Sequence, residues 1–237
     1  MKRARPTHAH GAALGAVLCL AGCGEDNGPQ RYFPLAPGHH WQYRIERTTM
    51  DGTQHIRHAV WTAPVPATLG VNGLRETLGG QRLHYVVDAD GIERVALPPA
   101  GAPADGQARV LVLPATLAPE VRWQAPGATT VLENTGPPWE TLFRVDVPVE
   151  LAYRVESLAA SVDTPAGHFD DCLLVTATGT ARADIGNYIG ETEVAIEIRE
   201  WYAPDVGLVR MERRETTDAA ALSAGGLVME LDSWSDD

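Results

Sequence analysis

The sequence predicts an all-β fold, a curved antiparallel sheet that forms a half-barrel or an open barrel. Two observations carry this prediction. Apolar and polar residues alternate with a period of two over most of the chain, which places one face of each strand in a core and the other in water. No long stretch after Cys23 repeats apolar residues at intervals of three and four, so crossover helices and a parallel sheet are not expected.

The first half of the chain supplies several predicted strands. Trp41, Tyr43 and Ile45 share one face of the first strand, and polar or charged residues between them share the other face. Residues 82–97 alternate around an Asp-Gly pair, which is typical of a hairpin turn. Residues 97–108 are rich in proline and glycine, and we expect a long loop there within the same domain.

The second half alternates even more strongly. Residues 141–158 predict one strand, and Pro148 lacks a backbone donor, so this strand is expected at a sheet edge or with a bulge. Residues 192–203 predict another strand with one apolar and one charged face. Residues 207–217 and 226–234 predict two closing strands, joined by a turn or a short helical piece.

The N-terminus has the layout of a secretory signal peptide. Three basic residues precede an apolar run at residues 11–20, which is too short to cross ~30 Å of hydrocarbon as a helix. Small residues and Cys23 close the stretch. We therefore expect export. An ordinary signal peptide that is cut elsewhere and an uncleaved anchor are the alternatives.

Leu20, Ala21, Gly22 and Cys23 resemble the lipobox of bacterial lipoproteins. The resemblance implies that signal peptidase recognises the first three residues and that the thiol of Cys23 receives a diacylglycerol. Cleavage then leaves Cys23 as the first mature residue. Two or three acyl chains, at about 0.8 kcal/mol per buried methylene, anchor a protein stably on a bilayer. Gly24 in place of Asp implies sorting to the outer membrane, facing the periplasm.

The chain is expected to have three parts. Residues 1–22 are the signal peptide, residues 23–30 are the lipidated cysteine and a polar tether, and residues 31–237 form a single β-rich domain. Cys172 is the only thiol left in that domain, so no intrachain disulfide is expected. Its strand-like surroundings indicate a buried thiol, with a reactive or metal-binding thiol as the alternative.

Charge and residue spacing restrict the possible chemistry. After the first 22 residues the chain holds 16 basic and 31 acidic residues, and a surface that acidic repels nucleic acid. The neighbouring pairs His39–His40 and Asp170–Asp171 would point to opposite faces of a strand. No zinc-ligand spacing and no G-x-S-x-G elbow is present. The sequence therefore predicts no catalytic residues, no metal site and no cofactor.

Three segments together resemble a group of uncharacterised bacterial envelope lipoproteins. They are YFPLAPGHHWQY at residues 32–43, VDTPAGHFDDCLLV at residues 162–175 and EWYAPDVGLVRMER at residues 200–213. That group looks related to the half-barrel fold of periplasmic lipoprotein carriers. The resemblance implies a strongly curved antiparallel sheet around an apolar concavity, and it brings no biochemical activity with it.

These observations predict a non-catalytic envelope lipoprotein that binds an apolar ligand or a protein partner on its curved sheet, or braces an assembly. Trp41, Tyr43 and Trp201 are the candidate aromatic residues, either facing a ligand or filling the core. The expected partners are a lipid bilayer, through acylated Cys23, and an apolar ligand or envelope protein. A lipid or lipoprotein carrier is the first alternative, and an envelope hydrolase is the second.

Overall fold

The structure is a computed structural model that describes residues 28–96, 108–136, 141–184, 190–222 and 224–236. The predicted signal peptide, the lipobox with Cys23 and nearly all of the predicted loop at residues 97–108 lie outside this range. The predicted strands fall within it, apart from Leu97 at the end of one of them.

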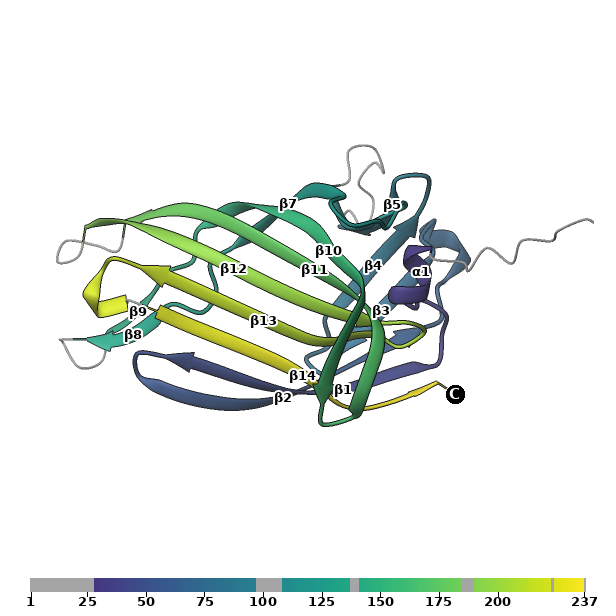
Figure 1. Ribbon diagram of the computed structural model, residues 1–237, viewed down its shortest axis with the longest axis horizontal. Coiled ribbons are helices and arrows are strands. Elements are labelled where there is room, and N and C mark those ends of the chain that lie inside the picture. Colours follow the sequence, from purple (N-terminus) through teal and green to yellow (C-terminus); the bar gives the residue numbers. More distant parts are fainter. Residues whose placement is uncertain (1–27, 97–107, 137–140, 185–189, 223, 237) are drawn as a thin grey trace, which may run out of the picture.

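The described residues form two antiparallel sheets with short helical pieces between strands (Figure 1). In chain order the elements are α1 (Pro29–Tyr32), β1 (His39–Thr49), β2 (Gly52–Ala63), η1 (Ala67–Leu69), β3 (Gly73–Thr77), β4 (Arg82–Val87), β5 (Gly91–Val95), β6 (Arg109–Pro114), β7 (Arg122–Ala128), β8 (Glu133–Gly136), β9 (Thr141–Arg144), β10 (Pro148–Thr164), β11 (Gly167–Asp184), β12 (Glu191–Ala203), β13 (Gly207–Thr217), η2 (Ala220–Leu222) and β14 (Ala224–Asp236).

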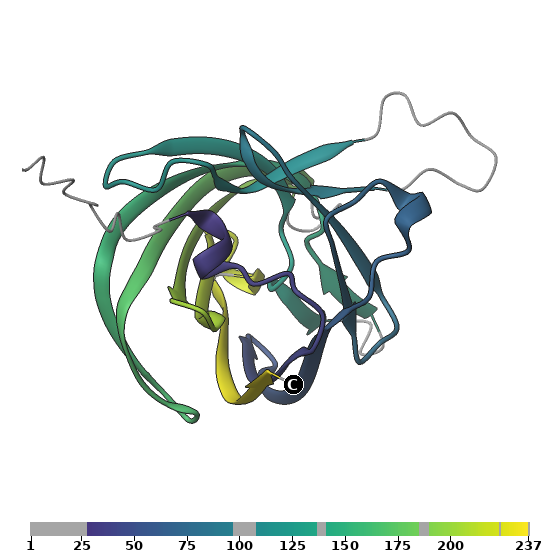
Figure 2. The same ribbon diagram turned by 90° about the vertical axis from the view of Figure 1, so that its right-hand side faces the viewer.

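Twelve strands make one sheet in the order β6-β5-β4-β3-β2-β1-β14-β13-β12-β11-β10-β7, and β8 pairs with β9 separately. The large sheet curls until its edge strands β6 and β7 contact each other (Figure 2). The prediction of a curved, antiparallel, all-β open barrel is confirmed for this part of the chain. The two predicted closing strands are β13 and β14, and η2 is the helical piece between them.

Burial alternates along the strands as the sequence predicts. In β12, Val194, Ile196 and Ile198 are buried, and the residues between them are exposed. In β1, Trp41 and Tyr43 are buried on one face. These faces point into the barrel, where apolar clusters form near both ends.

One strand differs from its prediction. The segment predicted as a single strand is divided into β9, which pairs with β8, and β10, which begins at Pro148. β10 pairs with β7 from Pro148 to Arg154 and with β11 from Ala152 onward, so Pro148 has a strand partner on one side while the following part of β10 lies between two strands. The missing donor is tolerated because Pro148 is the first strand residue. The predicted bulge does occur, but between Val155 and Val162.

The hairpin of β10 and β11 has the turn that its sequence predicts. Gly167 has a φ of 138°, a conformation that favours glycine, and it follows Pro165 in the turn. The hairpin curls over the outside of β13 and β14 (Figures 1 and 2), where the amide of Ala166 donates to the carbonyl of Leu231. Asp171, with a φ of 53°, lies in a bulge beside Cys172.

One end of the barrel is crossed by residues 28–38, here called the N-terminal segment (Figure 2). Tyr32 and Phe33 are buried in the interior cluster of that end. The amide of Asp205 donates to the carbonyl of Arg31 at 2.6 Å. The helix α1 starts at Pro29, inside the stretch predicted as a tether, because proline is favoured in the first turn of a helix.

The opposite end is filled by residues 128–133, which lie against the inner face of β13 and β1. The carboxylate of Glu215 is fully buried and accepts hydrogen bonds from the amides of Thr130 and Val131. Arg47 forms an ion pair with Glu133 at 2.6 Å. Residues 28–38 thus cover one end of the barrel and residues 128–133 fill the other. Between these two segments, inward-facing side chains of the strands line the interior.

The buried interior faces should dominate stability. We expect Ile196→Ala in β12 to lower the free energy of unfolding by about 2–5 kcal/mol, because it removes buried methyl groups and leaves a void. The matched change Ile56→Ala, at a side chain that is 44% exposed, should cost less than about 1 kcal/mol. Urea unfolding followed by tryptophan fluorescence measures both, and equal losses would contradict this assignment of the core.

Candidate functional site

A row of inward-facing side chains runs across five neighbouring strands, and we call it the inner row. It consists of Ile56, Ile45, Met229, Met211 and Glu200, each directly opposite the next in the strand register. Its apolar members share the inward faces of Tyr43 and Ile198. Ile56 is 44% exposed, the other four members keep intermediate exposure, and Val175 and Val155, which continue the row, are buried. The row therefore runs from a solvent-exposed sheet edge at Ile56 to the buried core at Val155.

The solvent-exposed edge of the inner row is formed by β2. β3 pairs with Val60–Ala63 of β2, and within the described residues no strand pairs with the outer side of Gly52–His58. Met50, 50% exposed, lies at the adjoining turn. An unpaired strand edge with exposed apolar side chains is unusual on a protein surface. Ile56, which lies at this edge, is therefore the most exposed member of the inner row.

Glu200 ends the inner row with a carboxyl group. Its Oε2 accepts a hydrogen bond from the hydroxyl of Tyr202 at 2.8 Å. Burial raises the pKa of Glu200, while the Tyr202 hydrogen bond and the charge of Arg213 oppose that rise. Within the described part of the chain, Oε1 has no hydrogen-bond partner. One carboxyl oxygen is thus available to a bound molecule.

Tyr153 lies near this carboxyl on β10, which is separated from β12 by β11 in the same sheet. Its ring stacks on that of Trp123 at 5.2 Å between centroids. Burial and the charge of Glu200 raise the pKa of Tyr153, and Arg213 and Arg94 oppose that rise. Glu200 is opposite Val175, which is opposite Val155, and Tyr153 shares the inward face of Val155, so these groups lie in one region of the barrel interior.

Arg75 is a buried cation at the end crossed by the N-terminal segment. Its side chain is stacked over the ring of Phe33, with Cζ 3.6 Å from the ring centroid, and Trp41 and Tyr85 lie 4.7 and 5.8 Å away. Nη2 donates to the carbonyl of Pro34 at 2.8 Å, while Nε is buried without a partner among the described residues. No carboxylate in those ranges pairs with Arg75. Aromatic faces therefore replace the usual counter-ion.

Arg94 on β5 is a second inward-facing arginine. It lies opposite Tyr85 in the register and shares its face, yet it is exposed. It forms no ion pair with the described residues. By contrast, the other inward arginines are paired, Arg47 with Glu133 and Arg213 with Glu215.

The aromatic residues singled out by the sequence divide between two faces. Trp41 is buried and its Nε1 donates to the carbonyl of Val206 at 2.7 Å. The hydroxyl of Tyr43 donates to the carbonyl of Leu208 at 2.9 Å, and burial raises its pKa. Trp201 lies half-buried on the outer face under Arg210. Of the three, Tyr43 adjoins the inner row.

Arg75, Arg94 and Glu200 were missed by the sequence reasoning. A signal was present for Glu200, because it occupies the apolar phase set by Val194, Ile196 and Ile198. Arg94 likewise stands in the phase of Ile92, on a strand too short for the pattern to be distinctive. A charged residue in the inward phase of a strand is the pattern to look for.

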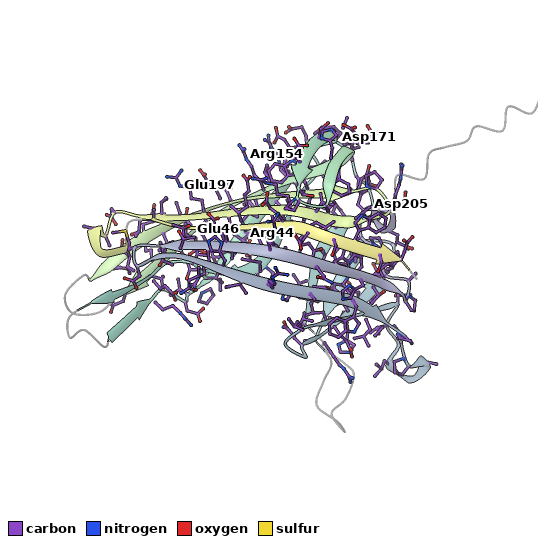
Figure 3. The ribbon with its side chains drawn as sticks, turned by 90° about the horizontal axis from the view of Figure 1, so that it is seen from below. Arg44, Glu46, Arg154, Asp171, Glu197 and Asp205 are labelled. Atoms are coloured by element: carbon purple, nitrogen blue, oxygen red, sulfur yellow. The ribbon has the colours of Figure 1, made fainter. Side chains whose placement is uncertain are left out.

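The outside of the barrel is charged. Figure 3 shows Arg44, Glu46, Arg154 and Glu197 spread over the outer face of the sheet. A hollow of about 600 Å³ over β12, β13 and β14 has a mixed lining, in which charged residues such as Glu197 alternate with apolar ones such as Val228.

The hairpin tip carries a small polar cluster. Asp170 accepts hydrogen bonds from Ser161 at 2.7 Å and from His168 at 3.2 Å. Hydrogen bonds with Asp163 and Asp170 raise the pKa of His168. All of these side chains are exposed, which is typical of a solvated turn. Within the described residues no group of three or more His, Cys, Asp and Glu is placed to hold a metal ion.

A match to a known protein family covers part of the second half of the chain. Residues 147–220 match a family model described as DUF3108-like. That stretch includes β11, β12 and β13, and with them Glu200 and Met211. No curated protein matches the chain.

Two solved structures are similar to the chain. One is of a candidate lipoprotein from Parabacteroides distasonis ATCC 8503, with 14% identity, 86% of this chain and 98% of that chain covered, and a TM-score of 0.43. The other is of a candidate exported protein with a YmcC-like fold from Bacteroides fragilis NCTC 9343, with the same identity and coverage and a TM-score of 0.35. No helix in the described ranges is long and apolar enough to cross a membrane.

Cys172 should behave as an inert thiol. It is fully buried, and burial with the nearby charges of Asp170 and Asp171 raises its pKa to about 11. At pH 8 the folded protein should therefore react with a disulfide reagent far more slowly than the urea-unfolded protein. The measurement is the difference in released chromophore between the native chain and Cys172→Ser. Fast reaction of the folded chain at pH 8 would contradict the buried assignment.

Proposed function

We propose that this protein is a non-catalytic, lipid-anchored envelope protein that holds an apolar ligand inside its barrel. The inner row is the observation that supports it: Ile45, Met211 and Met229 face inward and yet remain partly exposed. Covering such surface stabilises a complex by about 25 cal/mol per Å². Methionine side chains adapt to ligands of different shape.

The polar groups of the interior support binding rather than chemistry. Glu200, Tyr153 and Tyr202 can donate or accept hydrogen bonds, and they would fix the orientation of a ligand. Among the described residues around them, no serine or cysteine nucleophile lies beside a base. Of the alternatives, a lipid carrier agrees with this site, and a protein partner would have to use the exposed side chains near the β2 edge.

Anchoring would place one end of the barrel near the bilayer. Four residues lie between Cys23 and Gly28, where the described chain begins, and the five Cα-to-Cα steps span at most ~18 Å when extended. The N-terminal segment crosses the barrel end that holds Phe33 and Arg75. In the proposed outer-membrane location, that end would lie close to the lipid headgroups.

The proposed anchor has a direct test. Cells that express the native chain and are fed radioactive palmitate should label it, and the Cys23→Ala variant should remain unlabelled, because the variant lacks the thiol that accepts the lipid. Labelled bands are compared after gel electrophoresis of the full chain. Equal labelling of both chains, or none in either, would contradict the anchor.

The proposed ligand has a separate test. Native mass spectrometry of the full chain, purified from its own envelope in mild detergent, should show a co-purifying apolar molecule. Met211→Lys should lower its occupancy at least about tenfold, because a cation enters the apolar surface. Val228→Lys, on the outer face of the adjoining strand β14, is the matched control and should retain the ligand. Loss in both variants, or no ligand in the native chain, would count against the proposal.

A further inference from the structure

The barrel interior has the opposite charge balance to the chain as a whole. The chain has a formal net charge of −12. Its described inward-facing charges comprise four arginines and three glutamates, which are Arg47, Arg75, Arg94, Arg213, Glu133, Glu200 and Glu215. Arg47 and Arg144 both form ion pairs with Glu133, and Arg213 forms one with Glu215. Within the described ranges, two inward arginines, Arg75 and Arg94, have no carboxylate partner. Glu200 is the one inward glutamate there that forms no ion pair.

Glu200 does little to offset that excess. It already accepts a hydrogen bond from the hydroxyl of Tyr202, and burial raises its pKa, which favours its neutral form. An arginine, by contrast, remains charged at any physiological pH. The described interior therefore carries an excess of positive charge, which favours an anionic group over a neutral one once a ligand has entered.

Arg94 is the cation that a bound molecule can reach. Arg75 is 8% exposed and is covered by Phe33, whereas Arg94 is exposed on the inward face. Tyr85 lies beside Arg94 on the neighbouring strand, and the pKa of Tyr153 responds to the Arg94 charge. The hydroxyls of Tyr85 and Tyr153 make no hydrogen bond with other described residues, so both can donate.

We propose that the ligand is an anionic amphiphile whose carboxylate or phosphate head binds to Arg94. The tail lies along Ile45, Met229 and Met211, and the tyrosine hydroxyls complete the head site. Guanidinium groups bind such oxyanions through two parallel hydrogen bonds, and burial of the tail supplies the rest of the affinity. The inference rests on the proposed function, since it assigns the chemical class of the ligand for the same interior.

Photoaffinity labelling of the full chain in its own membranes tests this assignment. Two probes with the same diazirine-bearing tail are used, a fatty acid and the corresponding neutral alcohol. Label is quantified by mass spectrometry on peptides that contain Met211 or Met229. We expect the acid to label these peptides about tenfold more than the alcohol, which is the effect of about 1.4 kcal/mol of head-group binding.

Arg94→Gln should bring the ratio of acid to alcohol labelling close to one. Arg57→Gln is the matched control, because Arg57 is exposed on the outer face of β2 and forms no ion pair with the described residues. It should keep the native ratio. Competition with unlabelled palmitate and with lysophosphatidate then distinguishes a carboxylate head from a phosphate head, by which compound removes the label at lower concentration.

The outcomes separate the two proposals. Equal labelling by acid and alcohol in the native chain, or an unchanged ratio in Arg94→Gln, would overturn the anionic head group while leaving an apolar ligand in place. Absence of label from both probes on the inner peptides would overturn the proposed function as well.

Discussion

In a sheet that curls on itself, every second side chain of every strand enters the same interior, and this constraint governs the rest of the structure. Twelve strands send their inward residues into one space. Val155, Val175 and Ile196 fill part of it so closely that they are fully or almost fully buried. The arrangement leaves little freedom for charged inward residues, which must find a partner or reach water.

The chain segments that close the two ends of the barrel are held by different kinds of contact. The N-terminal segment is held by apolar packing and by Arg75, whose charge is balanced by aromatic rings and one carbonyl. The other end is held by ionic contacts and hydrogen bonds that converge on Glu215 and Glu133. Breaking either set would leave a buried charge without a partner, which is costly in a low-dielectric interior.

Between these ends the interior is neither uniformly dry nor uniformly charged. The inner row connects an exposed strand edge at Ile56 to a carboxyl group at Glu200. A wholly buried core would serve stability alone, and native cores reach high packing density. Partly exposed isoleucine and methionine inside a barrel have a stability cost that is recovered when a ligand covers them. This physical argument connects the fold to the proposed function.

The fold class could be predicted because period-two alternation is a local property of the chain. Trp41, Tyr43, Val194 and Ile198 are buried on the faces that the sequence indicates. The site could not be predicted in the same way. Ile45, Met229 and Met211 are brought together by strand order and register across β1, β14 and β13, which no local pattern encodes.

The sequence by itself determined the alternation, the turn at Gly167 and the lipobox-like N-terminus, because each depends on residues that are neighbours in the chain. Only the tertiary structure decided that the strand beginning at Pro148 continues between two neighbours, that Arg75 is buried under Phe33 and that Glu200 and Arg94 face one interior. These relations depend on how far the sheet curls and on which strands become neighbours, and both are set by long-range packing.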